Sequence, residues 1–348
     1  MNTWLDKIII VLFLTILVFT ALAHGAVEAW SSALASAALV VVFLLWVVRI
    51  CWQKRETIYL PSLLWPFLGL IVLTLVQSLA WTDETGKRMS LSLDVEATRH
   101  AAVWLGLLLI TLVMVANLFV NQERLKMLGT FCVWFGLLLS LFALLQQATW
   151  TGKFYWWRAV NTQQITMPFG PFVHHGHYAG YIELLLPLPI AFLITHTMRL
   201  ELKLLYSFAA AIMGISIVAS LARGGFLSLT AQIFFLVVAS RAMARRRRLG
   251  WDGKERAGRA GGVRVSAVLA IIIAIVVGVF WWGIQPVLER IAPEQGIESA
   301  QIAETFLQSR GWIWRDTWAV FRAHPLTGIG IGAFETAFPL YSQGDGAV

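Results

Sequence analysis

The chain has 348 residues, of which 58% are hydrophobic and only 13% are charged, and its mean hydropathy is +0.72. An ordinary soluble domain carries roughly 25% charged residues, so this composition argues against a soluble globular protein. The formal net charge is +8, and the two cysteines are too few for a disulfide framework. The composition therefore predicts an all-α integral membrane protein.

Apolar runs recur along the chain, and each approaches the ~20 residues that a helix needs to cross the hydrocarbon core. They cover residues 8–23, 33–48, 61–80, 101–120, 127–147, 177–195, 204–222, 224–240 and 266–284. None consists of about 10 residues that alternate between apolar and polar side chains, the pattern typical of a transmembrane β-barrel strand. We expect about nine transmembrane helices in a domain over 1–284, followed by a large extracytoplasmic loop over 285–348.

Basic residues set the expected orientation. Nine Lys and Arg residues lie between Arg241 and Arg264. The positive-inside rule makes 241–265 a cytoplasmic loop that faces anionic lipid, which places the N-terminus in the cytoplasm. We expect no nucleic-acid partner. The first apolar run resembles a secretory signal, but further spans follow it at once, so we predict an uncleaved first helix.

An arginine interrupts the apolar sequence at Ser220-Leu221-Ala222-Arg223-Gly224-Gly225. A charge at the bilayer centre costs on the order of 2.5–3.5 kcal/mol, so it usually faces a protein interior or a water-filled cavity. Guanidinium groups bind phosphate in bidentate fashion, and glycines let a ligand approach the backbone closely. Arg223 is therefore a candidate phosphate-binding residue, unless its side chain simply extends to the outer headgroups.

Three histidines, His174, His175 and His177, precede the span 177–195, which contains Glu183. No carboxylate or cysteine accompanies the histidines at a zinc-binding spacing, so we predict no metal site. Glu183 is the only acid inside a predicted span, and an intramembrane carboxylate is functional or ion-paired by default. We expect it to pair with Arg223.

The final segment predicts a surface helix and a tight turn. Residues 298–322 form an amphipathic pattern typical of a helix that lies on a membrane surface, and Pro325 ends it. The run Gly328-Ile329-Gly330-Ile331-Gly332 is not a dinucleotide site, because no βαβ unit surrounds it; we expect a membrane-proximal turn. The aromatic residues of the helix are Trp312, Trp314, Trp318 and Phe321.

Several of these blocks, in their order and spacing, resemble the O-antigen ligase and polysaccharide polymerase family of bacterial inner-membrane proteins. The resemblance covers roughly residues 100–340. It departs from the family around 174–176, where the family often carries asparagines. The blocks are Leu144-Leu145-Gln146 before Gly152-Lys153-Phe154-Tyr155-Trp156, Phe169-Gly170-Pro171-Phe172-Val173 with His177-Tyr178-Ala179-Gly180-Tyr181-Ile182-Glu183, Ala222-Arg223-Gly224-Gly225, and Arg310-Gly311-Trp312-Ile313-Trp314 followed by Pro325-Leu326-Thr327-Gly328.

The resemblance implies glycosyl transfer on the periplasmic face of the inner membrane, without a cofactor. The donor would be a glycan on undecaprenyl diphosphate, and the acceptor a hydroxyl of a lipid or a glycan. By the family pattern, Arg223 and Arg310 would hold the diphosphate, with Arg315 as a weaker candidate. Glu183 and His177 would support the site.

The family also uses a histidine motif, thought to act as general base. By the resemblance, that motif would lie beyond Val348, so we expect this chain to be incomplete and inactive as it stands. We do not assign that role to His324.

Other functions stay open at this point. A ligase and a polymerase of the family use the same parts. A transporter or lipid flippase would predict inverted repeats and broken helices near the bilayer midplane, which the sequence does not show. A metal-dependent glycosyltransferase would rest on the acidic pair Asp94 and Glu96 alone.

Overall fold

The computed structural model describes residues 4–53, 58–82, 86, 88–159, 168–195, 198–248 and 311–342. These belong to two compact units. Unit 1 comprises Met1–Phe13, Ser36–Val120 and Glu294–Val348, and unit 2 comprises Leu14–Ala35 and Asn121–Pro293. The expected span 266–284, most of the basic loop and Arg310 lie outside the described residues.

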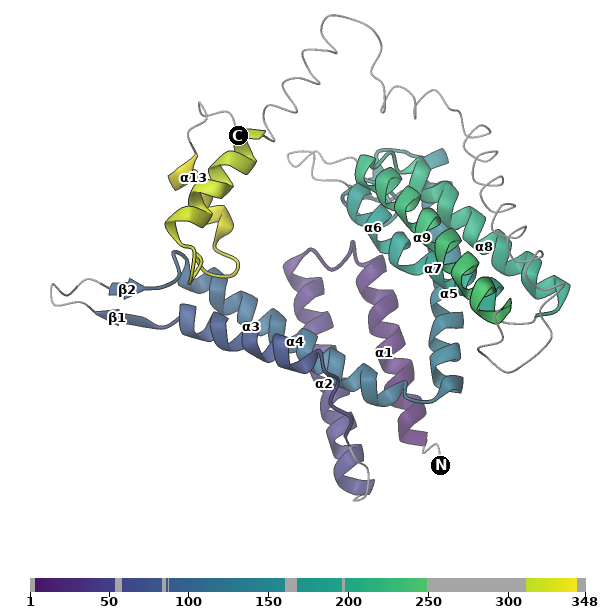
Figure 1. Cartoon of the computed structure of the whole chain (residues 1–348), viewed down its shortest axis with the longest axis horizontal. Helices are drawn as coiled ribbons and strands as arrows, with labels where there is room; N and C mark the ends of the chain where they lie inside the picture. The colour runs from purple at the N-terminus through teal and green to yellow at the C-terminus, as the bar shows by residue number, and fades with distance from the viewer. Residues whose placement is uncertain are drawn as a thin grey trace, which may run out of the picture. The chain divides into compact units, whose positions relative to one another are not determined.

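Helices dominate both units, and Figure 1 shows their order along the chain. Within the described residues, six helices or helix pairs are long and apolar enough to cross a membrane. This confirms an all-α, multi-pass membrane protein. They are α1 (Trp4–Leu22), α2 (Ala29–Gln53), α4 (Val95–Leu118), α5 (Gln122–Ala148), α6 (His175–Leu185) together with α7 (Pro187–Thr195), and α8 (Leu200–Ala219).

Shorter elements complete the described chain. The helices are α3 (Leu64–Gln77), α9 (Arg223–Arg248), whose apolar part is Gly224–Leu236, and α13 (Phe334–Tyr341). Two antiparallel hairpins pair β1 (Ala80–Thr82) with β2 (Arg88–Ser90), and β3 (Lys153–Phe154) with β4 (Arg158–Ala159). The first eight expected spans therefore each coincide with a helix or a helix pair, and the ninth lies outside the described residues.

Two of the expected spans differ from the observed helices in length or continuity. The span 61–80 contains a helix of only 14 residues, about 21 Å long, against a hydrocarbon core of about 30 Å. Its end is set at Ser78, whose hydroxyl donates to the carbonyl of Leu75 at 2.8 Å, and β1 begins two residues later. The span 177–195 is interrupted at Leu186, because Pro187 begins a new helix.

A buried ion pair joins α1 to α2 in unit 1. The helix α1 begins at Trp4, earlier than expected, and so includes Asp6, which pairs with Arg49 of α2. The two side chains are only 3% and 9% exposed. Removing one partner of such a pair leaves an uncompensated charge, which costs about 3–5 kcal/mol. The ion pair therefore ties α1 to α2.

The core of unit 2 lies where α5, α6 and α8 pack together (Figure 1). Small residues such as Ala209, Ala210 and Gly214 let α8 approach its neighbours closely. Buried hydroxyls meet inside this core. The Tyr178 hydroxyl donates to Ser140 Oγ at 3.4 Å, and Ser216 Oγ donates to the same oxygen at 3.2 Å.

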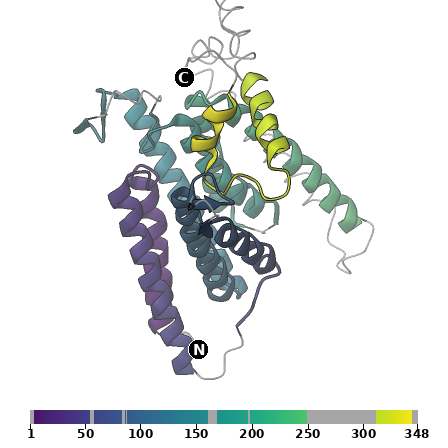
Figure 2. The ribbon, with the colours of Figure 1, turned by 90° about the vertical axis from the view of Figure 1, so that its left-hand side faces the viewer.

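Within unit 1, the segment 311–342 packs against the end of α3 (Figure 2). The contact is made by Gln77, the last residue of α3. Gln77 Nε2 donates to the carbonyl of Thr327 at 2.5 Å, and its Oε1 accepts from the N–H of Ile331 at 3.2 Å. Beside it, the N–H of Leu93 donates to the carbonyl of Ile329 at 2.9 Å. The end of α3 and the residues just before α4 are therefore in contact with the turn 327–331.

Two glycines make this close docking possible. Gly330 has φ +102° and Gly332 has φ +90°, a region that favours glycine. A Cβ at Gly330 would lie 2.2 Å from Ser92 Oγ and 2.6 Å from Thr98 Oγ1. The glycine run thus lets the turn lie directly against the start of α4.

We predict that Gly330→Ala loosens the docked turn far more than Gly328→Ala does. Both positions have positive φ, which costs a non-glycine residue about 1–2 kcal/mol. Only Gly330 adds a steric overlap, worth about 1–3 kcal/mol more, since a Cβ at Gly328 would meet its nearest atom at 3.7 Å. Hydrogen exchange at the amides of Leu93 and Ile331 measures the effect. Equal exchange in both variants would contradict the packing described.

Candidate functional site

A histidine cluster forms the N-terminus of α6. His174 is the N-cap, and its Nδ1 accepts the N–H of Gly176 at 2.9 Å. Its ring stacks on His175, with centroids 4.5 Å apart, and tilts against His177 at 5.1 Å. Across the residues that the structure describes, no group of three or more His, Cys, Asp or Glu is placed to hold a metal ion.

The capping role requires neutral His174, because only an unprotonated Nδ1 accepts a hydrogen bond. Burial, with a smaller contribution from the neighbouring His177, lowers the pKa of His174 below its ordinary value of 6.5. The environment thus favours the form that caps the helix.

Pro187 leaves the carbonyl of Glu183 without its normal helical partner. In a continuous helix the N–H of residue 187 would donate to this carbonyl, four residues earlier, but proline has no N–H. Gln232 of α9 supplies the missing donor, with Nε2 2.9 Å from the Glu183 carbonyl oxygen. The break between α6 and α7 is therefore a proline kink satisfied by a neighbouring helix.

The Glu183 side chain also contacts α9. Ser228 Oγ donates to Glu183 Oε2 at 2.6 Å. The other oxygen, Oε1, is buried and accepts no hydrogen bond from any described residue. Gly225 allows this approach, since a Cβ there would lie 3.3 Å from Oε1 and 3.1 Å from Ala179 Cβ.

A tight turn between α8 and α9 places Arg223 at the start of α9. Leu221 adopts φ +56°, and Ser220 Oγ donates to the carbonyl of Ile217 at 2.6 Å. The two glycines that follow Arg223 have different surroundings: Gly225 packs on α6, whereas nothing lies within 4 Å of a Cβ built at Gly224. The structure thus brings Glu183 to the first turns of α9. The side chain of Arg223 lies outside the described part, so the ion pair between them stays a prediction.

Polar contacts also connect the loops at one end of unit 2. Arg158 Nη2 donates to both carboxylate oxygens of Glu28, at 2.6 and 2.7 Å, which lowers the pKa of Glu28. His24 Nδ1 donates to the carbonyl of Pro171 at 2.7 Å, and burial lowers the pKa of His24. The Tyr155 hydroxyl donates to the carbonyl of Leu22. These contacts join the segment 22–28 to Tyr155, Arg158 and Pro171 within unit 2.

The third predicted arginine, Arg315, belongs to unit 1. It lies in a helical stretch over 311–323 and its Nε donates to Asp316 Oδ1 at 3.1 Å. Asp316 is 4% exposed and Arg315 56%, so the guanidinium contacts the carboxylate and still reaches solvent. The aromatic residues Trp312, Trp314, Trp318 and Phe321 of the expected amphipathic helix are exposed.

Asp94, considered as part of a metal-dependent site, has a structural role. It caps α4, with Oδ1 accepting the N–H of Ala97 at 2.9 Å, and its Oδ2 accepts the hydroxyl of Thr336 at 2.7 Å. Both bonds lower the pKa of this carboxyl group. An Asp three residues before the bonded N–H is an ordinary helix-start signal.

Sequence reasoning missed Ser228 and Gln232, which contact Glu183, and Gln77, which binds the C-terminal turn. For Ser228 and Gln232 the sequence contained a usable signal. Pro187 identifies Glu183 as the residue whose carbonyl needs a donor, and Ser228 and Gln232 are polar residues inside the expected span 224–240. No such signal connected Gln77 with Thr327.

We predict that Gln232→Leu destabilises the protein by about 1–3 kcal/mol, because it leaves the partly buried Glu183 carbonyl without a donor. In a Pro187→Ala background the same change costs much less, since residue 187 then supplies its own N–H. Thermal unfolding of the four proteins in detergent measures this double-mutant cycle. Additive effects of the two substitutions would count against the kink described.

We predict that the first turn of α6 is less stable at pH 5.5 than at pH 7.5. The folded-state pKa of His174 is lowered, so the unfolded state binds the proton more readily. The stabilisation is complete above pH 6.5 and is lost as the pH falls through the lowered pKa. Hydrogen exchange at the Gly176 amide, corrected for intrinsic rate, measures it. His174→Asn keeps a good N-cap and should remove the pH dependence; the same pH dependence in that variant would refute the assignment.

Part of the chain is similar to a known protein family. Residues 208–347 match the model of the O-antigen ligase family. The match begins within α8 and includes Arg223, Arg310 and Arg315, and it confirms the family resemblance over this part of the chain. No curated protein and no solved structure matches the chain. The match supports an O-antigen ligase or polymerase type of function in polysaccharide biosynthesis, with a lipid-linked glycan and an acceptor as substrates.

Proposed function

From this family match and the turn between α8 and α9, we propose that the protein transfers a glycan from undecaprenyl diphosphate to an acceptor hydroxyl on the periplasmic face of the bacterial inner membrane. The acceptor oxygen attacks the anomeric carbon, the bond from that carbon to the diphosphate oxygen breaks, and the hydroxyl proton leaves to a base. We assign no residue as that base.

The observation that carries this proposal is the position of Arg223 as the first residue of α9. The first N–H groups of a helix have no intrahelical partner and favour an anion. Here they follow a tight turn, and the open space at Gly224 leaves room for a ligand next to the backbone. A phosphate at this point would meet both a guanidinium group and free N–H groups.

This arrangement suits a diphosphate leaving group. Negative charge develops on the diphosphate as the glycosidic bond breaks, and fixed cationic groups stabilise that charge without a metal. We propose that Arg223 and Arg310 supply two such groups. Arg315 is the weaker candidate, because its Nε already donates to Asp316.

Glu183 and His177 would act as supporting residues. Glu183 holds the first turns of α9 through Ser228 and Gln232, and so helps to fix the position of Arg223. His177 is exposed on the first turn of α6, six residues before Glu183, or about 9 Å along the helix. It is therefore a candidate for contacts with the polar part of a substrate.

We predict that Arg223→Ala or Arg310→Ala, introduced into the chromosomal gene, abolishes the surface glycan while the protein level is unchanged. Arg223→Lys should restore little, because an ammonium group lacks the planar, bidentate geometry of a guanidinium. Glycan electrophoresis and an immunoblot measure the two quantities. Arg315→Ala, with its predicted smaller effect, is the matched control. Normal glycan in both alanine variants would refute the diphosphate role.

A polymerase of the same family is the second candidate, and a deletion strain separates the two. Loss of a ligase leaves complete lipid-linked chains that are not transferred, whereas loss of a polymerase leaves single lipid-linked repeat units. Extraction and sizing of the lipid-linked glycans distinguishes these outcomes. Accumulation of neither species would contradict both functions.

A further inference from the structure

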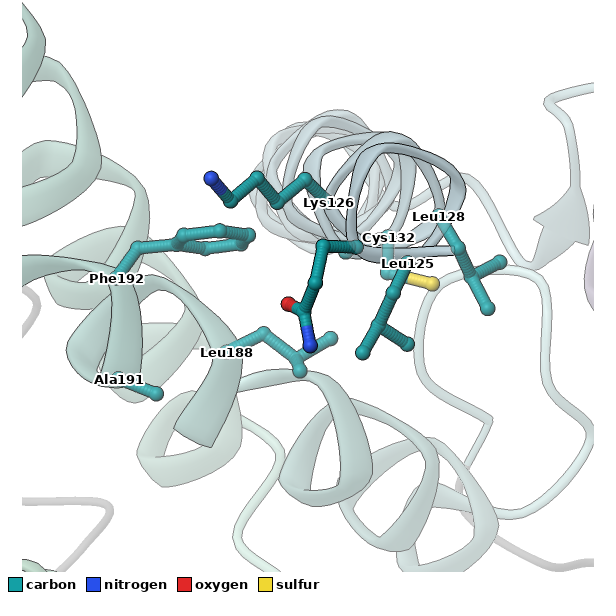
Figure 3. Close-up of a pocket in the computed structure, with 9 residues that line it drawn as sticks. Leu125, Lys126, Leu128, Cys132, Leu188, Ala191 and Phe192 are labelled. Atoms are coloured by element: carbon teal, nitrogen blue, oxygen red, sulfur yellow. The ribbon is translucent and has the colours of Figure 1, made fainter. Parts of the chain in front are cut away.

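A groove in unit 2 opens between the first turns of α5 and the helix α7 (Figure 3). Its volume is about 370 Å³, within the range of small-molecule sites. Most of its lining is apolar, and the polar groups gather on the first turns of α5. The lining consists of Gln122, Leu125, Lys126, Leu128, Gly129, Cys132, Leu188, Ala191 and Phe192.

The shape of the groove follows from one close helix contact. Gly129 has no side chain, and Phe192 fills that space, since a Cβ at Gly129 would lie 2.9 Å from Phe192 Cζ. The Phe192 ring also packs edge to face against Tyr206, with ring centroids 5.4 Å apart. The aromatic wall is thus fixed by packing, which makes the groove a built feature of the fold.

The polar end of the groove favours an anion. Lys126 is exposed, and Figure 3 shows its side chain extending past the Phe192 ring. Asn121 caps α5 without a side-chain hydrogen bond, so the first N–H groups of α5 receive no acceptor from their own cap. Glu123 lies on the same turn but does not line the groove. An anionic headgroup here would contact the Lys126 ammonium group and the N-terminus of α5, beside the apolar side chains that line the groove.

This groove is distinct from the proposed reaction site. Its polar end lies at the first turns of α5, whereas Arg223 is the first residue of α9, and no residue assigned to the proposed reaction site lines the groove.

We propose that this groove binds an anionic glycerophospholipid, with one acyl chain against Leu125, Leu188 and Phe192 and the phosphate at Lys126 and Gln122. The bound lipid packs between α5 and α7 and so supports the segment that follows the Pro187 kink. This inference does not depend on the proposed transferase activity.

Cys132 lines the groove and provides a direct test. The chain contains one other cysteine, Cys51, which is exposed and belongs to unit 1. In a Cys51→Ser background the full chain is purified in a nonionic detergent, and the alkylation rate of Cys132 by a maleimide is measured. Phosphatidylglycerol or phosphatidylcholine is then added at equal mole fraction. At about ten times its Kd, the anionic lipid should slow alkylation about tenfold, and the zwitterionic lipid much less.

Two lysine variants test the headgroup contact. Lys126→Gln should remove the preference for phosphatidylglycerol, whereas Lys203→Gln, on α8 and outside the groove lining, should keep it. Native mass spectrometry of the same proteins counts the retained lipids independently of thiol reactivity, and should show one fewer anionic lipid in Lys126→Gln only.

Three results would overturn the proposal. Equal protection by both lipids would show a groove that recognises hydrocarbon alone. No protection by either lipid would show that no lipid occupies it. A thiol that reacts only after unfolding in lipid-free protein would show that another part of the protein covers the groove.

Discussion

The carbonyl of Glu183 loses its helical donor at Pro187, and in hydrocarbon no water can replace that donor. Gln232 of α9 supplies the donor instead, because its side-chain amide donates a hydrogen bond to this carbonyl. One turn away, Ser228 donates to the carboxylate of the same residue. These two bonds hold the first half of α9 against α6, and Gly225 removes the side chain that would separate them. The position of the α9 start, and therefore of Arg223, depends on this junction.

The same constraint explains other polar contacts of the molecule. Each buried polar group that lacks a partner costs about 1–3 kcal/mol or more, which favours packing that pairs such groups. Asp6 therefore pairs with Arg49 between α1 and α2. The hydroxyls of Tyr178 and Ser216 both donate to Ser140 Oγ. Apolar packing between helices is similar in energy to packing against lipid. The polar contacts thus select which helix faces which.

Hydropathy predicted the helices well because bilayer thickness sets a length that can be read directly in the sequence. Helix ends were harder, because they depend on local bonds: the hydroxyl of Ser78 ends α3 early, and Asp94 starts α4 six residues before the expected span. Contacts between residues far apart in the sequence could not be predicted. Pairing Glu183 with Ser228 and Gln232 requires the packing of α6 on α9, which no residue pattern encodes by itself. The sequence did place Arg223 between two apolar runs, and the structure has its backbone at the start of α9.

Gln77 illustrates a cost that appears during synthesis. Its amide is 3% exposed and binds Thr327, which lies 250 residues further along the chain. At about 5–20 residues per second, the ribosome delivers Thr327 some 12–50 s after Gln77. During that interval the Gln77 amide lacks these partners, because Thr327 and Ile331 have not yet been synthesised. Water at the membrane surface can hydrogen-bond the amide in the meantime, and this contact of unit 1 forms only after the glycine turn has been synthesised.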